Sequence, residues 1–286
     1  MMLQHARTAK LAAVFFFAAA LAGCQVWPPA AELAHEGALR VAVLTSNPII
    51  GSKDPKTGEL KGTTVDLGRA LANRAGIPVR FIEYTAIGKL MDDATANVWD
   101  VAVVAIDPAR RKVVNFAPAH LAADGFLTVL VPPGSAAKTM ADLDKDGVQI
   151  AAVRGAAPLM ILERTLKSAK AVAAETEDQA FALMRDGKAQ GYAQNRFMLR
   201  ARARTLPGSR VIDDAFAGLQ LAFAVPRGRS AAIELVDNFI EEAKANGAVQ
   251  AAIDAAGVAQ DVRVAPAVTL NTRFPAWGDL RERPKD

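Results

Sequence analysis

The sequence is poor in the residues that most often carry disulfides, metal sites and nucleic-acid contacts. It contains one cysteine and three histidines in 286 residues. A single cysteine excludes an intramolecular disulfide, and the scattered histidines do not form a zinc-binding pattern. Aromatic residues make up only 6%, and no run of lysines and arginines is interleaved with aromatics, as a nucleic-acid surface would require. We therefore expect no metal, no cofactor and no nucleic-acid partner.

Apolar residues are abundant. They make up 51% of the chain, against 22% charged residues, so the chain can bury a core and is not disordered. The formal charge of +4 is a small excess of 34 basic over 30 acidic residues. The length fits either one large domain or two smaller lobes.

The first residues have the pattern of a bacterial export signal. Met1–Lys10 contains Arg7 and Lys10 and no acidic residue, and Leu11–Ala22 is apolar throughout. Twelve residues in a helix span roughly 18 Å, which is short of the ~30 Å hydrocarbon core of a membrane. This stretch therefore predicts a signal peptide and not a membrane-spanning helix.

The end of that segment, Leu21-Ala22-Gly23-Cys24, resembles the bacterial lipobox, in which the cysteine is acylated and becomes the mature N-terminus. We expect residues 1–23 to be a lipoprotein signal peptide and Cys24 to carry the lipid. Residues 24–36 would then be a tether that anchors the protein to the membrane on its periplasmic or extracytoplasmic side. An ordinary export signal with a chance cysteine is the alternative.

Predicted strands and helices alternate from Gly37 onward. The predicted strands are 38–44, 78–84, 100–106, 126–131, 148–153, 172–174, 190–193, 211–212 and 219–225. The predicted helices are 63–75, 87–94, 140–143, 157–166, 177–186, 195–204, 231–245 and 248–256. Residues 51–62 predict a hairpin or loop, because they contain three glycines and a proline. His120 is expected in an exposed loop.

Two runs of this alternation predict two α/β lobes. Residues 37–131 with 224–257 would form lobe 1, residues 132–223 lobe 2, and residues 258–286 an irregular C-terminal tail. Two crossover strands would join the lobes, with hinges near Val131-Pro132-Pro133 and Ala224-Val225-Pro226. A ligand would lie in the cleft between the lobes, near strand carboxyl ends and helix amino ends.

Several segments, in order, resemble family 3 extracellular solute-binding proteins, the polar amino-acid receptors of ABC importers. The matching stretches are Gly37–Val43, Gly58–Gly62 followed by Val65-Asp66-Leu67, Trp99–Val101, Asp107–Arg110, Val114–Ala117, Ala141–Leu143 and Val148–Ile150 followed by Gly155. The resemblance implies a two-lobed type II periplasmic-binding-protein fold, in which each lobe is a mostly parallel sheet flanked by helices. It also implies a monomer that binds a small polar solute and delivers it to permease and ATPase subunits.

The same resemblance implies where the ligand binds. Arg110 matches the family arginine that clamps the ligand carboxylate with its planar guanidinium. Asp107-Pro108 predicts a helix start whose backbone N–H groups would add to this anion site. Asn47 and Ile49, in the loop after the first strand, are expected to line the cleft.

Three positions depart from the family pattern. Asp107 stands where the family usually has threonine, and Gly155-Ala156-Ala157 lacks the hydroxyl that usually follows the glycine. Asn195 stands where an aspartate usually holds the ligand ammonium, so it supplies no charge. The ligand is therefore expected to be an amino acid or a related carboxylate.

Two other functions remain open. A sensory or accessory lipoprotein would bind a solute without importing it. A few dehydratases that act on cyclic carboxylic acids share the fold, and such an enzyme would need a general acid in the cleft, for which Asp107 is the candidate. We expect a binding protein and not an enzyme.

Overall fold

The computed structural model describes residues 33–34 and 36–270. The predicted signal peptide and the lipidated Cys24 lie outside these residues. Within them, each helix is too short or too polar to cross a membrane.

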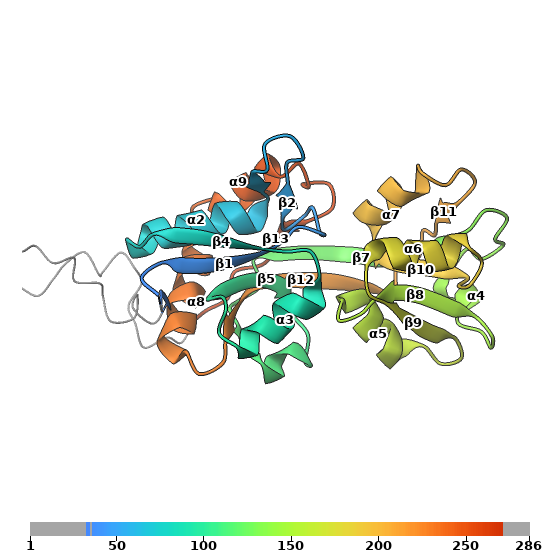
Figure 1. The fold of residues 1–286 in the computed structure, drawn as a ribbon, viewed down its shortest axis with the longest axis horizontal. Coiled ribbons are helices and arrows are strands. Elements are labelled where there is room, and N and C mark those ends of the chain that lie inside the picture. The colour runs from blue at the N-terminus through green and yellow to red at the C-terminus, as the bar shows by residue number, and fades with distance from the viewer. Residues whose placement is uncertain (1–32, 35, 271–286) are drawn as a thin grey trace, which may run out of the picture.

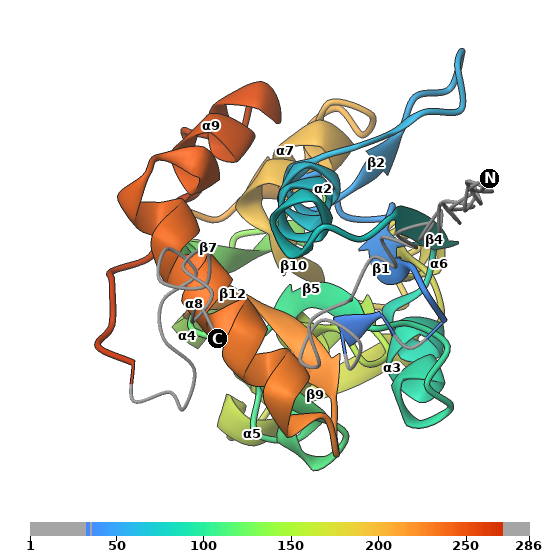
Figure 2. The same ribbon diagram turned by 90° about the vertical axis from the view of Figure 1, so that its left-hand side faces the viewer.

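The first lobe is built around three parallel strands. β1 (Leu39–Leu44) lies between β4 (Val79–Tyr84) and β5 (Val101–Ala105). Every residue of β1 and β5 is buried, as expected for strands covered by helices on both faces. One face carries α2 (Thr63–Ala75) and α9 (Ala248–Ala255), and the other carries α3 (Ile87–Thr95) and α8 (Ser230–Ala245) (Figures 1 and 2). The hairpin of β2 (Ser52–Lys53) and β3 (Leu60–Lys61) lies in the predicted loop before α2.

The second lobe repeats this plan. β8 (Gln149–Val153) runs parallel to β9 (Lys170–Ala174) on one side and to β10 (Gly191–Asn195) on the other. Side chains alternate along β8, so Ile150 and Ala152 belong to one apolar cluster and Ala151 and Val153 to another. The lobe also contains α4 (Met140–Leu143), α5 (Ala157–Thr165), α6 (Glu177–Arg185), α7 (Arg196–Ala203) and β11 (Arg210–Val211).

Two long antiparallel strands, β7 (Leu121–Val131) and β12 (Ala217–Pro226), run through both lobes (Figure 1). They join the strands of the described residues into one 11-stranded sheet whose main path is β4-β1-β5-β12-β7-β10-β8-β9. The type II periplasmic-binding-protein fold predicted from the sequence is therefore the fold of this chain.

The change from one lobe to the other occurs in the middle of these strands. Residues 221–224 of β12 pair with β5, whereas residues 127–130 of β7 pair with β10. Between these stretches the β7–β12 register shifts at Gly218, and nearby Gly125 has a φ of 58°. A Cβ on Gly218 would come within 2.9 Å of the Ala123 carbonyl oxygen, so this crossing requires glycine. The predicted hinges at 131–133 and 224–226 are wrong, because they lie at the outer ends of β7 and β12.

The end of the predicted tether belongs to the folded lobe. Leu33 is fully buried and Ala34 is 7% exposed, and both lie in the apolar core of the first lobe. Glu36 forms ion pairs with Arg40 and Arg80. Residues 33, 34 and 36 are therefore not a free leash.

Other local predictions also need correction. β6 (Val114–Phe116) pairs with β12 and had no predicted counterpart. In the predicted irregular tail, β13 (Arg263–Val264) pairs with the start of β7. His120 is fully buried and not in an exposed loop, because its backbone N–H donates to Leu221 and its carbonyl accepts from Ala265 within this sheet.

A buried ion network holds α8 against the first sheet. The Asp100 carboxylate accepts hydrogen bonds from the Arg40 side chain at 2.9 and 3.0 Å and from Arg229 at 2.5 Å. It also accepts from the Arg40 backbone N–H at 2.9 Å. Since Asp100 is fully buried, these four donors replace its hydration.

Candidate functional site

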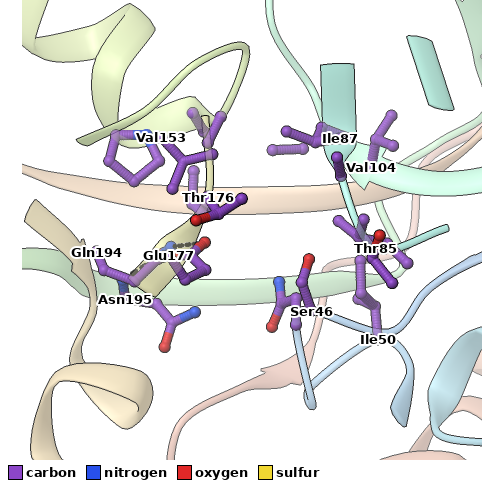
Figure 3. Close-up of a pocket in the computed structure, with 18 of the residues that line it drawn as sticks. Ser46, Ile50, Thr85, Ile87, Val104, Val153, Thr176, Glu177, Gln194 and Asn195 are labelled. Atoms are coloured by element: carbon purple, nitrogen blue, oxygen red, sulfur yellow. Dashed lines mark hydrogen bonds between the residues drawn. The ribbon is translucent and has the colours of Figure 1, made fainter. Parts of the chain in front are cut away.

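A cavity of about 660 Å³, including its open mouth, lies between the lobes. Figure 3 shows Thr176, Glu177, Gln194 and Asn195 on the second-lobe side, facing residues of the first lobe. The lining residues are Leu44, Ser46, Asn47, Ile50, Thr85, Ala86, Ile87, Val104, Ala105, Arg110, Val153, Ala156, Ala157, Pro158, Glu175, Thr176, Glu177, Gln194, Asn195, Leu219 and Leu221.

The fold explains why these residues meet. Most of them come from the carboxyl ends of β1, β5, β8 and β10 and from the amino ends of α3, α5 and α6, while Leu219 and Leu221 come from the crossing strand β12. In open parallel sheets these ends form the ligand crevice. The wall mixes aliphatic side chains with a few polar groups, as small-molecule sites usually do.

Arg110 lines the cavity and is 6% exposed. Its Nη1 donates to the Ala105 carbonyl in its own lobe at 2.8 Å, and its Nη2 donates to the Gly155 carbonyl in the opposite lobe at 2.8 Å. Its Nε is buried without a hydrogen-bond partner among the described residues. Of the five N–H groups of a guanidinium, three therefore remain to be used.

No carboxylate of the described residues forms an ion pair with Arg110, although the charge of the nearby Asp107 partly offsets the effect of burial on its pKa. Burial lowers the pKa of Arg110 to about 10. A buried cation with free donors in a cavity is a site for an anion, and its planar fork suits a carboxylate.

Asp107 does not line the cavity. Its carboxylate pairs with Arg164 of α5 at 2.9 Å, across the two lobes, and its Oδ1 also accepts from the Ala109 backbone N–H at 2.8 Å. The helix predicted to start at Asp107-Pro108 is a three-residue 3-10 turn, Arg110–Lys112. The predicted contribution of helix N–H groups to an anion site is therefore wrong, because this turn is too short to hold a row of free N–H groups.

The Gly155-Ala156-Ala157 segment forms the entry to α5. Gly155 does not line the cavity, but its carbonyl accepts from Arg110, and its φ of 72° is the left-handed conformation that favours glycine. A Cβ there would lie 3.6 Å from the Gly88 Cα of the first lobe. Ala156 and Ala157 line the cavity through methyl groups, so this wall offers no hydroxyl.

Asn195 lines the cavity at the start of α7. Its Oδ1 accepts from the Met198 backbone N–H at 2.8 Å, which caps the helix. The amide Nδ2 is left as a donor for a ligand, and Oδ1 keeps one lone pair but carries no charge.

Of the two residues predicted to line the cleft after β1, Asn47 and Ile49, one lines the cavity and the other does not. Asn47 lines the cavity, and its Oδ1 accepts from the Ile49 backbone N–H at 3.3 Å. Ile49 is fully buried in the first-lobe core and does not line the cavity, whereas its neighbour Ile50 does. The prediction for Ile49 is wrong by one residue because the turn at 47–50 points that side chain inward.

Sequence reasoning missed Glu177 and Gln194. Glu177 is the first residue of α6, and its carboxylate accepts from the Tyr192 hydroxyl and, at 2.7 Å, from Gln194 Nε2. Burial raises the pKa of Glu177, and burial beside this carboxylate raises the pKa of Tyr192. The available signal was Thr176-Glu177-Asp178-Gln179, a threonine cap and two acids that open a helix after a strand.

The described residues contain no group of three or more histidine, cysteine, aspartate or glutamate side chains that could hold a metal ion.

Comparison with known proteins gives consistent relatives. The ABC transporter glutamine-binding protein GlnH of Bacillus subtilis is 23% identical over 209 residues, which cover 72% of this chain and 76% of GlnH. The structure of an L-arginine-bound substrate-binding protein of an amino acid ABC transporter from Streptococcus pneumoniae matches with a TM-score of 0.66 at 18% identity, covering 80% of this chain and 97% of that one.

A third relative is the ancestral amino acid-binding protein AncCDT-1, a precursor of cyclohexadienyl dehydratase, which matches with a TM-score of 0.65 at 24% identity and covers 79% and 97% of the two chains. The family model of the bacterial extracellular solute-binding proteins, family 3, matches residues 39–255. Because that match spans both lobes, this chain belongs to the bacterial extracellular solute-binding proteins, family 3.

Proposed function

We propose that this protein is the extracytoplasmic substrate-binding component of an ABC importer and captures a small polar solute, an amino acid or a related carboxylate. The observation that carries the proposal is Arg110, a buried guanidinium on the wall of the inter-lobe cavity with no carboxylate partner and with an unused Nε. A ligand carboxylate would supply both the missing charge and the missing acceptors.

The relatives support the importer role. GlnH is named as a glutamine-binding protein of an ABC transporter, and a glutamine-binding protein of Geobacillus stearothermophilus is 22% identical over 189 residues. On this basis, the partners would be permease and ATPase subunits, and the protein would act as a monomer.

Lobe closure would bury the solute. The two lobes, divided where β7 and β12 change partners near Gly125 and Gly218, would rotate about that crossing. Arg110 and Gly155 lie on opposite lobes, and Arg110 Nη2 donates to the Gly155 carbonyl oxygen at 2.8 Å. Arg110 would therefore contact both the ligand and the opposite lobe when the lobes close.

Lipidation of Cys24 would hold the protein at the membrane. Because Leu33 is already in the core, only residues 25–32 would separate the lipidated residue from the folded lobe. Eight extended residues span at most about 29 Å, so the lobe would stay within that distance of the lipid headgroups. Metabolic labelling with a radioactive fatty acid, lost in Cys24→Ser, tests this part of the proposal.

A thermal-shift screen of the full-length protein in detergent tests the receptor function. The panel sets the L-amino acids against mono- and dicarboxylates, sugars and amines. A solute at ~100 times its Kd stabilises by about 2.7 kcal/mol, which raises Tm by several degrees. We expect a carboxylate-bearing solute to do so in the wild type and in Arg111→Ala, but not in Arg110→Ala.

Arg111 is a matched control, because it is the adjacent arginine but points at the Phe116 ring, 5.4 Å from its centroid, and does not line the cavity. Binding that is confined to sugars or amines, or that is unchanged in Arg110→Ala, would contradict the proposal. A sensory role predicts the same binding without uptake. Uptake of the solute by cells with and without this protein distinguishes the two roles, because only an importer component is required for it.

The acid predicted for the dehydratase alternative, Asp107, does not line the cavity, whereas Glu175 and Glu177 do line it. Asp107 lies off the cavity wall and is paired with Arg164, so it does not reach a substrate held between the lobes. Release of water from a cyclic carboxylic acid by the purified protein would reopen that alternative.

A further inference from the structure

The second-lobe wall carries a carboxylate that the family pattern does not assign. We infer that Glu177, and not Asn195, binds the positively charged end of the ligand, so that the cavity selects a zwitterion with its carboxylate on Arg110 and its ammonium on Glu177. This inference rests on the proposed function and names the ligand class of the same site.

The first support is the position of Glu177. It lines the cavity from the first turn of α6, next to the cap residue Thr176, and Gln194 lies beside it (Figure 3). One carboxylate oxygen accepts from Tyr192 and the other accepts from Gln194 at 2.7 Å. These two bonds fix the orientation of the carboxylate, and they use only two of its roughly four acceptor positions.

The second support is charge. Tyr192 and Gln194 are neutral donors, and no lysine, arginine or histidine of the described residues forms an ion pair with Glu177. Arg202, whose charge acts on Glu177, forms its ion pair with the neighbouring Asp178. Glu177 is therefore a partly buried carboxylate that is held in place without an ion pair of its own.

The third support is the chemistry of Asn195. Its Oδ1 already accepts from the Met198 backbone N–H, so it can offer an ammonium at most one further lone pair and no charge. Its Nδ2 is a donor and suits a ligand carboxylate or carbonyl. The negative charge that an ammonium prefers is thus at the start of α6 and not at the end of β10.

Arg110 and Glu177 carry opposite charges and line the same cavity. Arg110 needs an anion and Glu177 needs a cation, and a zwitterion supplies both in one molecule. A carboxylate without an amine would leave Glu177 uncompensated, and an amine without a carboxylate would leave Arg110 uncompensated. Since an unpaired buried charge is costly, either partial ligand should bind more weakly than the zwitterion.

The competing explanation is structural. Glu177 also organises a chain in which Gln194 donates to Glu177 and accepts from the Asn195 backbone N–H at 2.8 Å. A purely structural role would weaken the binding of every ligand to a similar extent, whereas recognition of the ammonium would weaken only the binding of ligands that carry it.

The test compares each L-amino acid that raises the Tm of the wild-type full-length protein with the same molecule lacking its α-amino group. Calorimetric titration measures both Kd values in the wild type, Glu177→Gln, Glu177→Asp and the control Asp178→Asn. Asp178 follows Glu177 on the same helix turn but is exposed and off the cavity wall, so its substitution reproduces the change in helix-end charge.

We expect Glu177→Gln to weaken binding of the amino acid by at least about 30-fold, because it removes one member of a buried charge pair. The Kd of the deaminated analogue should change by less than about 3-fold in the same variant. That result would also show that the site remains folded. Glu177→Asp should recover part of the loss, and Asp178→Asn should bind both molecules like the wild type.

Two results would overturn the inference while the proposed function stands. One is that Glu177→Gln weakens the binding of the amino acid and of its deaminated analogue equally. The other is that the wild type binds the analogue as tightly as the amino acid, where in both cases binding still requires Arg110. A wild type that binds no carboxylate at all would overturn both.

Discussion

Asp107 of the first lobe and Arg164 of the second form an ion pair across the mouth of the cleft, with 2.9 Å between Oδ2 and Nη1. Together with the bond from Arg110 to the Gly155 carbonyl, it joins the two lobes. The Asp107 carboxylate, which stands at the threonine-to-aspartate departure, is therefore engaged with the opposite lobe.

Removing this ion pair should open the ligand-free protein. We expect Arg164→Ala to increase the radius of gyration measured by small-angle X-ray scattering and to weaken solute affinity several-fold, because Asp107 is left buried without its partner. Arg185→Ala, which breaks the exposed pair with Asp186 inside the second lobe, is the control and should leave both quantities unchanged. A radius that does not change in Arg164→Ala would show that the pair does not hold the lobes together.

Arg110 should reduce the stability of the empty protein. Its guanidinium is buried, forms no ion pair with a described residue and has an unpaired Nε, and burial lowers its pKa to about 10. We expect Arg110→Met to abolish solute binding while the Tm of the ligand-free protein stays the same or rises, because methionine removes the desolvation cost. Differential scanning calorimetry measures this, and a fall of many degrees would show that the bonds to Ala105 and Gly155 outweigh the cost.

Solute affinity should depend on pH through Glu177. Burial raises the pKa of this carboxyl above its ordinary value of 4.5, while Tyr192, Gln194 and Arg202 act in the opposite direction and Asp178 adds to the rise. An ammonium binds only the ionised form, so the affinity for an amino acid should fall as the pH falls through the raised pKa. In Glu177→Gln that pH dependence should disappear. Calorimetric titration between pH 4 and pH 8 checks both, and an identical slope in the variant would assign the titration to another group.

His120 should make the fold sensitive to acid. It is fully buried beside Phe223, neither ring nitrogen has a partner among the described residues, and burial, with Lys244 nearby, lowers its pKa from 6.5 to about 3. Below pH 6.5 the unfolded chain takes up a proton that the folded chain does not, so stability is lost as the pH falls towards 3. His120→Leu should be more stable than the wild type at pH 7 and should lose less between pH 7 and pH 4. Urea unfolding at the two pH values tests this, and parallel losses in both proteins would contradict it.

Asp100 should be the carboxylate whose loss costs the most stability in the first lobe. We expect Asp100→Ala to cost about 3–5 kcal/mol, because it leaves Arg40 and Arg229 buried without their shared partner. Glu36→Ala removes the exposed partner of the same Arg40 and should cost less than about 1 kcal/mol. Chemical denaturation of the two variants makes the comparison, and equal effects would contradict the burial argument.

The parts of the fold that local chemistry determines could be predicted from the sequence. The α2 bounds agree residue for residue with the prediction, because Gly62 and Gly76 flank the helix and Gly76 ends it in the left-handed conformation. β7 is five residues longer than the predicted 126–131 because residues 121–123 are stabilised by pairing with β12 and β13, which are distant in sequence. No local pattern contains that information.

Some residues of the candidate site could likewise be predicted from the sequence, and others could not. The resemblance to the family placed Arg110, Asn195, Ala156 and Ala157 in the cleft, the loop after the first strand placed Asn47 there, and the structure has all five on the cavity wall. Asp107 could not be assigned, since its partner Arg164 comes from another lobe. Glu177 was missed because a glutamate in the first turn of a helix is usually explained by the helix dipole alone.

The strands of the two lobes, apart from the β2–β3 hairpin, belong to one continuous hydrogen-bonded sheet among the described residues. If the second lobe unfolded alone, β7 would lose its pairing with β10 and β11, and if the first lobe unfolded alone, β12 would lose its pairing with β5 and β6. The lobes should therefore melt as one cooperative unit, with a calorimetric enthalpy equal to the van't Hoff enthalpy, although each has its own helices and its own core.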